Sequence, residues 1–284
     1  MSARRLTLAS ILLIITLLII VFTPVKKETS NKIIVAATIP PEKEFIEKIA
    51  GDKVQVIVMV PKGADPHTYE PNPETLEKLK NAKVYFEIGS GIEFEKKWME
   101  NIKSINPHIL IVNCSEGIKL LPSSEGTDPH VWNSPKNAIK IVENIYTTLS
   151  KIDPSNKNYY ERNKDRYVSE LKKLDNEFSE TLSHRKNKYI LVYHPAWGYL
   201  CHDYGLKQIA IEKEGKEPNP ETIKEIINEA KRYQIKTIFI TPLTNKENSK
   251  VIAKEIGAKI IVIDPLAENY VENMYKVLEA LKHE

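Results

Sequence analysis

Short runs of apolar, mostly β-branched residues alternate with segments of helical periodicity along most of this chain. Each run is nearly continuous in apolar residues, as expected for a parallel strand that is buried on both faces. Eight such runs begin at Lys32, Val54, Lys83, His108, Tyr189, Lys207, Lys236 and Lys259. Strands that alternate with helices predict parallel sheets covered by helices. We therefore expect an α/β protein with two lobes, each containing a mostly parallel four-stranded sheet and flanking helices.

The break between the fourth and fifth runs predicts one long helix. Residues 155–183 contain no Gly or Pro, and their apolar residues recur at helical spacing. Asp153 and Pro154 provide a start signal. We expect an N-terminal lobe at 30–152, a linking helix at 153–186 and a C-terminal lobe at 187–284. The stripe lacks the regular heptads of a coiled-coil arm, so we expect a monomer.

The first 29 residues differ from the rest of the chain. Arg4 and Arg5 precede an uncharged, largely apolar run from Leu6 to Pro24, which is long enough to span a bilayer. The leading arginines favour an N-terminus that stays inside. We interpret 1–29 as an export signal that anchors the protein at the membrane or is cleaved to release it, which puts the remainder outside the cytoplasm.

Two fragments occur twice. The first, Glu-Pro-Asn-Pro-Glu-Thr, starts at Glu70 and at Glu217. Asn at the N-cap followed by Pro at the first helical position predicts a helix start in both places. The second, Asp-Pro-His, ends at His67 and at His130. The two histidines of this fragment are candidate functional residues.

Four candidate metal ligands follow predicted strands: His67, His130, His194 and Asp264. In open α/β sheets, ligands bind beyond the carboxyl ends of the strands. Two candidates come from each half, so we expect them to meet between the lobes. Three imidazoles and one carboxylate complete a tetrahedral shell for Zn²⁺. Asp65 and Asp128 are candidates to orient an imidazole as outer partners.

Other functions are less consistent with these residues. The net charge is +3, and the lysines are interleaved with glutamates, which is unlike a nucleic-acid surface. Four protein ligands leave no open position for the water of a catalytic zinc. Two alternatives remain: a zinc-dependent hydrolase with Glu212 or Glu214 as general base, and an adhesin with a structural metal.

His202 is a rival candidate ligand. It lies eight residues beyond His194, about 12 Å along one helix, which is too far to share the ion.

Four segments resemble the motifs of cluster A-I metal-binding lipoproteins, the family 9 solute-binding receptors of zinc and manganese ABC importers. They are DPHTYEPNP from Asp65, DPHVW from Asp128, YHPAWGYLCHDYGL from Tyr193 and VIDPLAENY from Val262. The resemblance implies two lobes joined by one long helix, with the metal held between them by His67, His130, His194 and Asp264. It implies a receptor, not an enzyme, that delivers the metal to a permease and its ATPase.

The resemblance also bears on the metal. Manganese-type members typically have Glu at the third ligand position. This chain has His194 there, which favours Zn²⁺ and leaves Mn²⁺ as the alternative. The His- and acid-rich loop of many zinc receptors is missing, because the segment from Asn113 to Pro129 contains no histidine. The lipid-attachment cysteine is also missing, so the apolar N-terminal run would hold the protein at the membrane.

Overall fold

The structure is a computed structural model that describes residues 32–123, 126–212 and 217–282. Residues Lys32–Glu284 form one compact unit. The expected anchor at 1–29 lies outside the described residues. Within the described ranges, no helix is both long enough and apolar enough to cross a bilayer.

The first four predicted strands form one parallel sheet with the order β2-β1-β3-β4. Helices connect the strands, and a short antiparallel hairpin follows the fourth strand. In chain order the elements are β1 (Ile33–Ala37), α2 (Pro40–Ala50), η1 (Gly51–Lys53), β2 (Val54–Val58), α3 (Pro73–Lys78), η2 (Leu79–Asn81), β3 (Val84–Glu87), α4 (Glu93–Ile105), β4 (Leu110–Asn113), β5 (Pro122–Ser123), β6 (Gly126–Thr127), η3 (Val131–Asn133) and α5 (Pro135–Ile152).

The last four predicted strands form a second parallel sheet with the order β10-β9-β7-β8. Numbered from the first strand of each lobe, both sheets have the order 2-1-3-4, so the two lobes repeat one topology. The elements are η4 (Pro154–Asn156), α6 (Lys157–Ser183), β7 (Tyr189–Val192), α7 (Gly198–Asp203), β8 (Lys207–Ala210), α8 (Pro220–Arg232), β9 (Thr237–Ile240), α9 (Lys246–Ile256), β10 (Lys259–Val262) and α10 (Tyr270–Lys282).

The repeated Glu-Pro-Asn-Pro-Glu-Thr fragment begins a helix in both lobes, as predicted. Asn72 caps α3 by accepting a hydrogen bond from the backbone N–H of Thr75 at 2.8 Å. Asn219 caps α8 through Thr222 at 2.9 Å. Each helix leads into the third strand of its lobe, β3 or β9. The fragment therefore has a structural role, in which a side-chain oxygen satisfies a free helix donor.

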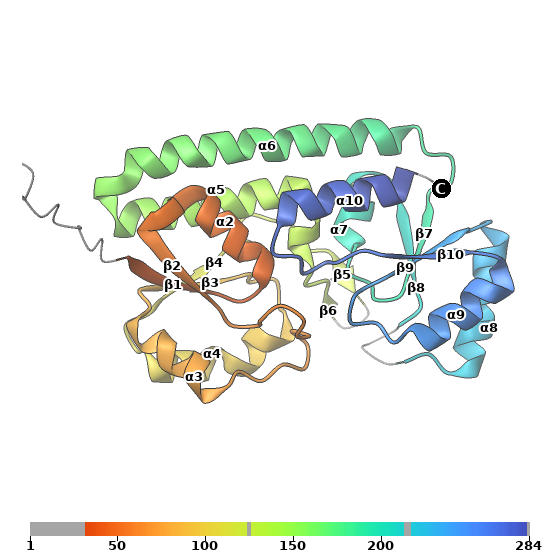
Figure 1. Cartoon of the computed structure of the whole chain (residues 1–284), viewed down its shortest axis with the longest axis horizontal. Helices are drawn as coiled ribbons and strands as arrows, with labels where there is room; N and C mark the ends of the chain where they lie inside the picture. The colour runs from red at the N-terminus through yellow and green to blue at the C-terminus, as the bar shows by residue number, and fades with distance from the viewer. Residues whose placement is uncertain (1–31, 124–125, 213–216, 283–284) are drawn as a thin grey trace, which may run out of the picture. The chain divides into compact units, whose positions relative to one another are not determined.

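The predicted long helix is α6, which has 27 residues and is about 40 Å long at 1.5 Å per residue. The apolar stripe predicted from the sequence is its buried face, made of Tyr160, Tyr167, Val168, Leu171, Leu174, Phe178 and Leu182. Figure 1 shows α6 passing α5 and α2 first and α10 later, and it contacts all three helices. The predicted fold class, two four-stranded parallel sheets linked by one long helix, is confirmed.

One apolar core extends through both lobes. Phe45 of α2, Trp132 of η3, Phe178 of α6 and Tyr270 of α10 belong to the same buried cluster. The rings of Phe45 and Tyr270 meet edge to face with centroids 4.9 Å apart. The two lobes are therefore packed against each other through one shared core.

Candidate metal centre

His67 lies in the loop between β2 and α3, in the first Asp-Pro-His triplet. Asp65 Oδ1 accepts a hydrogen bond from the backbone N–H of His67 at 2.9 Å, which closes a tight turn. The imidazole Nδ1 lies 2.6 Å from Oε2 of Glu93, the first residue of α4. The loop therefore fixes the backbone of His67 through Asp65, and another element orients its ring.

His130 lies in the second triplet, after the β5–β6 hairpin, and its side chain is buried. Asp128 Oδ1 accepts from the backbone N–H of His130 at 2.9 Å, the same turn as in the first triplet. The same oxygen also lies 2.8 Å from the imidazole Nδ1. Here one carboxylate fixes both the backbone and the ring.

His194 follows β7 and precedes α7. Its imidazole Nδ1 lies 3.3 Å from Oε1 of Glu212, which follows the neighbouring strand β8. All three histidines and their carboxylates thus lie beyond the carboxyl ends of the strands or in the loops there. This is the edge at which open α/β sheets bind their ligands.

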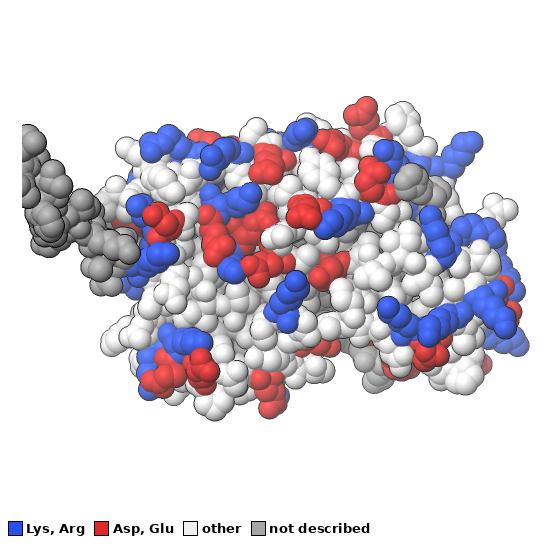
Figure 2. Space-filling model, in the orientation of Figure 1, with Lys and Arg blue, Asp and Glu red and all other residues white. Residues whose placement is uncertain are grey.

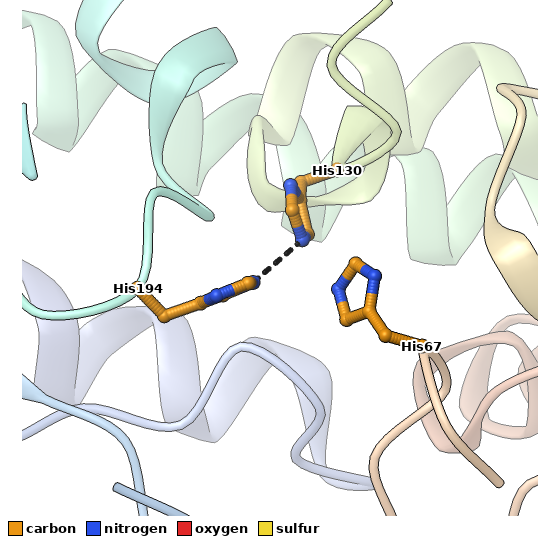
Figure 3. Close-up of side chains that lie close together, drawn as sticks. All are labelled: His67, His130 and His194. Atoms are coloured by element: carbon orange, nitrogen blue, oxygen red, sulfur yellow. Dashed lines mark hydrogen bonds between the residues drawn. The ribbon is translucent and has the colours of Figure 1, made fainter. Parts of the chain in front are cut away.

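The three imidazoles converge. Nε2 of His130 and Nε2 of His194 are 3.1 Å apart, and the ring of His67 lies beside them (Figure 3). One nitrogen from each histidine lies within 4.8 Å of one nitrogen from each of the others. A separation of this size suits several ligand atoms arranged around one metal ion, because Zn–N bonds are about 2.0–2.1 Å long.

A carboxylate lies at Nδ1 of each of these three imidazoles, namely Glu93, Asp128 and Glu212. Because an ionised carboxylate accepts hydrogen bonds and does not donate them, these partners favour the tautomer in which Nδ1 carries the hydrogen and Nε2 is free for a metal. Such partners fix the tautomer and the ring orientation and raise the basicity of the ligand nitrogen. The site is therefore preorganised for a cation.

Burial and neighbouring charges act differently on two of the imidazoles. For His130, burial is the largest effect and lowers its pKa, although the hydrogen bond to Asp128 opposes this. For His67, burial also lowers the pKa, but the hydrogen bond to Glu93 and nearby carboxylates outweigh it, so the pKa is raised. The hydrogen bond to His67 in turn lowers the pKa of Glu93 to about 2. His130 is thus ready to bind metal at neutral pH, whereas a proton competes with metal more strongly at His67.

The three histidines line a cavity of about 870 Å³, and Asp264 lies on its wall. Asp264 Oδ1 accepts a hydrogen bond from the backbone N–H of Leu266 at 2.9 Å. Within the described part of the chain, the group of ligand atoms that lie within 4.8 Å of one another contains the three histidines and not Asp264. The structure therefore brings three of the four predicted ligands together and leaves the fourth at the side of the same cavity.

The predicted outer partners differ from the observed ones in one respect. Asp128 lies at the imidazole of His130, as expected for an orienting residue, but Asp65 bonds only the backbone of His67. A short Asp side chain two residues before the histidine reaches its N–H first, because that geometry closes a turn. Sequence reasoning missed Glu93, which lies 26 residues after His67. Its position at the start of a helix after β3 is the only signal that could have found it.

His202 was considered as a rival ligand, and Glu212 and Glu214 as a general base. His202 is exposed, and its Nδ1 lies 3.0 Å from Oδ1 of Asp203, away from the three imidazoles. Glu212 was considered as a general base, and it instead lies at Nδ1 of His194. Glu214 lies outside the described residues.

The chain is similar to proteins of zinc uptake. Residues 35–284 match the family described as zinc-uptake complex component A, periplasmic (ZnuA). The high-affinity zinc uptake system protein ZnuA of Bacillus subtilis (strain 168) is 31% identical over an alignment of 281 positions, which covers 89% of this chain and 87% of the relative. A crystal structure of ZnuA superimposes with a TM-score of 0.85 at 36% identity, covering 89% of this chain and 98% of that one.

A zinc-bound relative is also similar. The Zn(II)-bound ZnuA-like domain of AdcA from Streptococcus pneumoniae superimposes with a TM-score of 0.78 at 32% identity, covering 89% of this chain and 98% of that domain. The chain spans 56% of the length of the whole AdcA protein of S. pneumoniae (strain R6). The family match covers most of the chain, and the predicted resemblance to family 9 metal receptors is confirmed. The chain belongs to the family of periplasmic zinc-uptake complex component A.

Proposed function

We propose that this protein captures Zn²⁺ outside the cytoplasm and delivers it to the permease of an ABC importer, which an ATPase drives. The observation that carries the proposal is the convergence of three imidazoles, each held by a carboxylate at Nδ1. Imidazole nitrogen suits zinc, and an outer carboxylate strengthens the ligand. The family and its zinc-bound member support the same cargo.

We assign His67, His130, His194 and Asp264 as the ligands of this cargo. Asp264 follows β10 on the wall of the cavity, and Oδ1 is the oxygen that bonds Leu266. Its other oxygen, Oδ2, is the one we assign to the metal. Four protein ligands leave no open position for water and substrate, so the protein is a receptor and not an enzyme. Three nitrogen ligands also favour Zn²⁺ over Mn²⁺.

The charges of the cavity favour a cation. Among the described residues, six carboxylates and one lysine line it: Asp65, Glu93, Asp128, Glu212, Glu217, Asp264 and Lys96. A cleft lined by one sign of charge concentrates counter-ions and steers them inward. The face in Figure 2 carries residues of both signs, with acidic residues also gathered between α2, α6 and α10. The carboxylates of the cavity thus surround the place where the three imidazoles meet.

The proposal also assigns the rest of the chain. Residues 1–29 carry the protein out of the cytoplasm and either anchor it or are removed. The N-terminal lobe at 30–152 and the C-terminal lobe at 187–284 supply two ligands each, and 153–186 joins them. The receptor acts as a monomer, because both halves of its ligand set lie in one chain.

Growth under zinc limitation tests the function. A strain without this gene should grow poorly when zinc is chelated and recover with excess zinc. The wild-type gene should restore growth without added zinc. The His194→Ala variant should not, whereas His202→Ala, the matched control outside the site, should. A deletion strain that grows like its parent under chelation, with no second zinc receptor present, would contradict the proposal.

A further inference from the structure

The carboxylate that orients His130 is packed against the other lobe. Asp128 Oδ2 lies so close to Gly198, the first residue of α7, that a Cβ on this glycine would be 2.2 Å from it. No side-chain carbon fits at that distance. Asp128 cannot simply turn away, because its Oδ1 makes both hydrogen bonds to His130. The position of Asp128 therefore requires a residue without a side chain at 198.

The next residue of α7 holds the backbone of Asp128. The hydroxyl group of Tyr199 donates to the carbonyl oxygen of Asp128 at 2.9 Å and accepts from the backbone N–H of Leu121 at 3.0 Å. The Asp128 N–H in turn donates to the Leu121 carbonyl at 2.9 Å. Burial raises the pKa of Tyr199 to about 12, so its hydroxyl stays neutral and keeps its hydrogen. The residues that flank the hairpin, Leu121 and Asp128, are thus both hydrogen-bonded to the hydroxyl group of one buried tyrosine.

The start of α7 is itself fixed. The backbone N–H of Trp197 donates to Gln208 Oε1 on β8 at 3.2 Å. The side-chain amide of Asn133, three residues after His130, donates to the carbonyl of Ala196 at 3.0 Å. The segment that begins at His194 therefore runs directly into the two residues that hold Asp128. One short stretch of the C-terminal lobe supplies one imidazole and supports the orienting partner of another.

We propose that Gly198 and Tyr199 are positioning residues of the zinc site, which hold Asp128 where its Oδ1 orients the His130 imidazole. The inference rests on the proposed function. Neither residue is one of the assigned ligands, and both contact Asp128, so we expect each to act on zinc through Asp128. A purely structural role would lower stability without this dependence.

A double-mutant cycle tests this dependence, with zinc affinity measured by competition with a chelating dye at neutral pH. Losing the hydrogen-bond partner of a metal ligand typically lowers metal affinity about 10–100-fold. Asp128→Ala should lower zinc affinity within that range, and Gly198→Ala should lower it about 10-fold. In the Asp128→Ala background, Gly198→Ala should cause no further loss, because the clash is gone. Unchanged affinity for Gly198→Ala, or the same loss in both backgrounds, would overturn the proposal.

Tyr199→Phe gives an independent test that leaves the shape of the core intact. It should weaken zinc binding by about 5-fold. Without the hydroxyl, the backbone groups of Leu121 and Asp128 lose a buried hydrogen-bond partner, and Asp128 is held less firmly. The matched control is Tyr204→Phe. Tyr204 caps the C-terminus of α7, and its partly buried hydroxyl donates to Asp175 at 2.8 Å. The control should lower stability and leave zinc affinity unchanged. Equal zinc affinities for the two variants would overturn the proposal.

The same titrations separate this inference from the proposed function. Wild-type protein that binds zinc, with Gly198 and Tyr199 variants that bind equally well, would overturn the inference alone. Wild-type protein that does not bind zinc would overturn the proposed function and this inference with it.

Discussion

Replacing Glu93 by glutamine removes the charge at the outer nitrogen of His67 while keeping the size of the side chain. Glu93 Oε2 lies 2.6 Å from His67 Nδ1, and this hydrogen bond is the main reason that the pKa of Glu93 falls from 4.5 to about 2. At 1.36 kcal/mol per pKa unit, the difference corresponds to about 3 kcal/mol. Because the Glu93 side chain is 38% exposed, solvent screening reduces this to about 1–2 kcal/mol.

Loss of the interaction between Glu93 and His67 should lower the affinity for zinc. If the carboxylate stabilises the metal-bound imidazole to a similar extent, Glu93→Gln should weaken zinc binding roughly 5–30-fold at pH above neutral. The assay is a competition titration with a zinc chelator, repeated at several pH values. Glu100→Gln is the matched control, since Glu100 lies on the same helix and pairs with exposed Lys103 at 2.9 Å. Its zinc affinity should equal that of the wild type.

The pH dependence of zinc binding tests the direction of this effect. The carboxylates near His67 raise its pKa, so in the wild type a proton competes with zinc as the pH falls through that raised value. Glu93→Gln removes the main stabilising partner of the proton, which shifts this competition to lower pH. The ratio of wild-type to variant affinity should therefore be largest above pH 7 and shrink towards pH 5. A ratio of one at high pH, or a ratio that grows on acidification, would refute the reasoning.

Four further substitutions probe the ligand set and the shared core. His130→Ala should weaken zinc binding by orders of magnitude with the fold intact, whereas His202→Ala should not; equal losses in a zinc titration would contradict the assigned ligands. His194→Glu should lower the ratio of zinc to manganese affinity without inverting it, because two imidazoles remain and zinc is intrinsically preferred; an unchanged ratio in paired competition titrations would exclude His194 as a ligand. Phe178→Ala, in the buried face of α6, should reduce the free energy of unfolding by about 3–5 kcal/mol in denaturant melts, and a loss below 1 kcal/mol would show that the shared core tolerates the cavity.

The sequence predicted the features that depend on local patterns. Eight apolar runs became the eight strands of the two main sheets, because a parallel strand buried on both faces needs continuous apolar residues. Asn72 and Asn219 were found as caps because the cap and the N–H it accepts lie only three residues apart. The stripe on α6 was found because helical periodicity is visible along one segment.

The features that depend on contacts between distant segments could not be predicted in the same way. Glu93 lies 26 residues after His67 and Glu212 lies 18 residues after His194, and no spacing rule joins them. The close approach of Gly198 to Asp128 depends on how α7 packs against a loop of the other lobe. Such residues become visible only when the fold brings the segments together.

The central claim is that three imidazoles bind one zinc ion, and X-ray absorption at the zinc edge tests it most directly. Protein loaded with one equivalent of zinc should give nitrogen or oxygen neighbours at about 2.0–2.1 Å, with outer scattering from three imidazole rings. The Asp264→Ala variant should lose one oxygen neighbour and keep the imidazole scattering. A spectrum of the wild type that has scattering from fewer than three imidazoles, or sulfur neighbours at about 2.3 Å, would contradict the account.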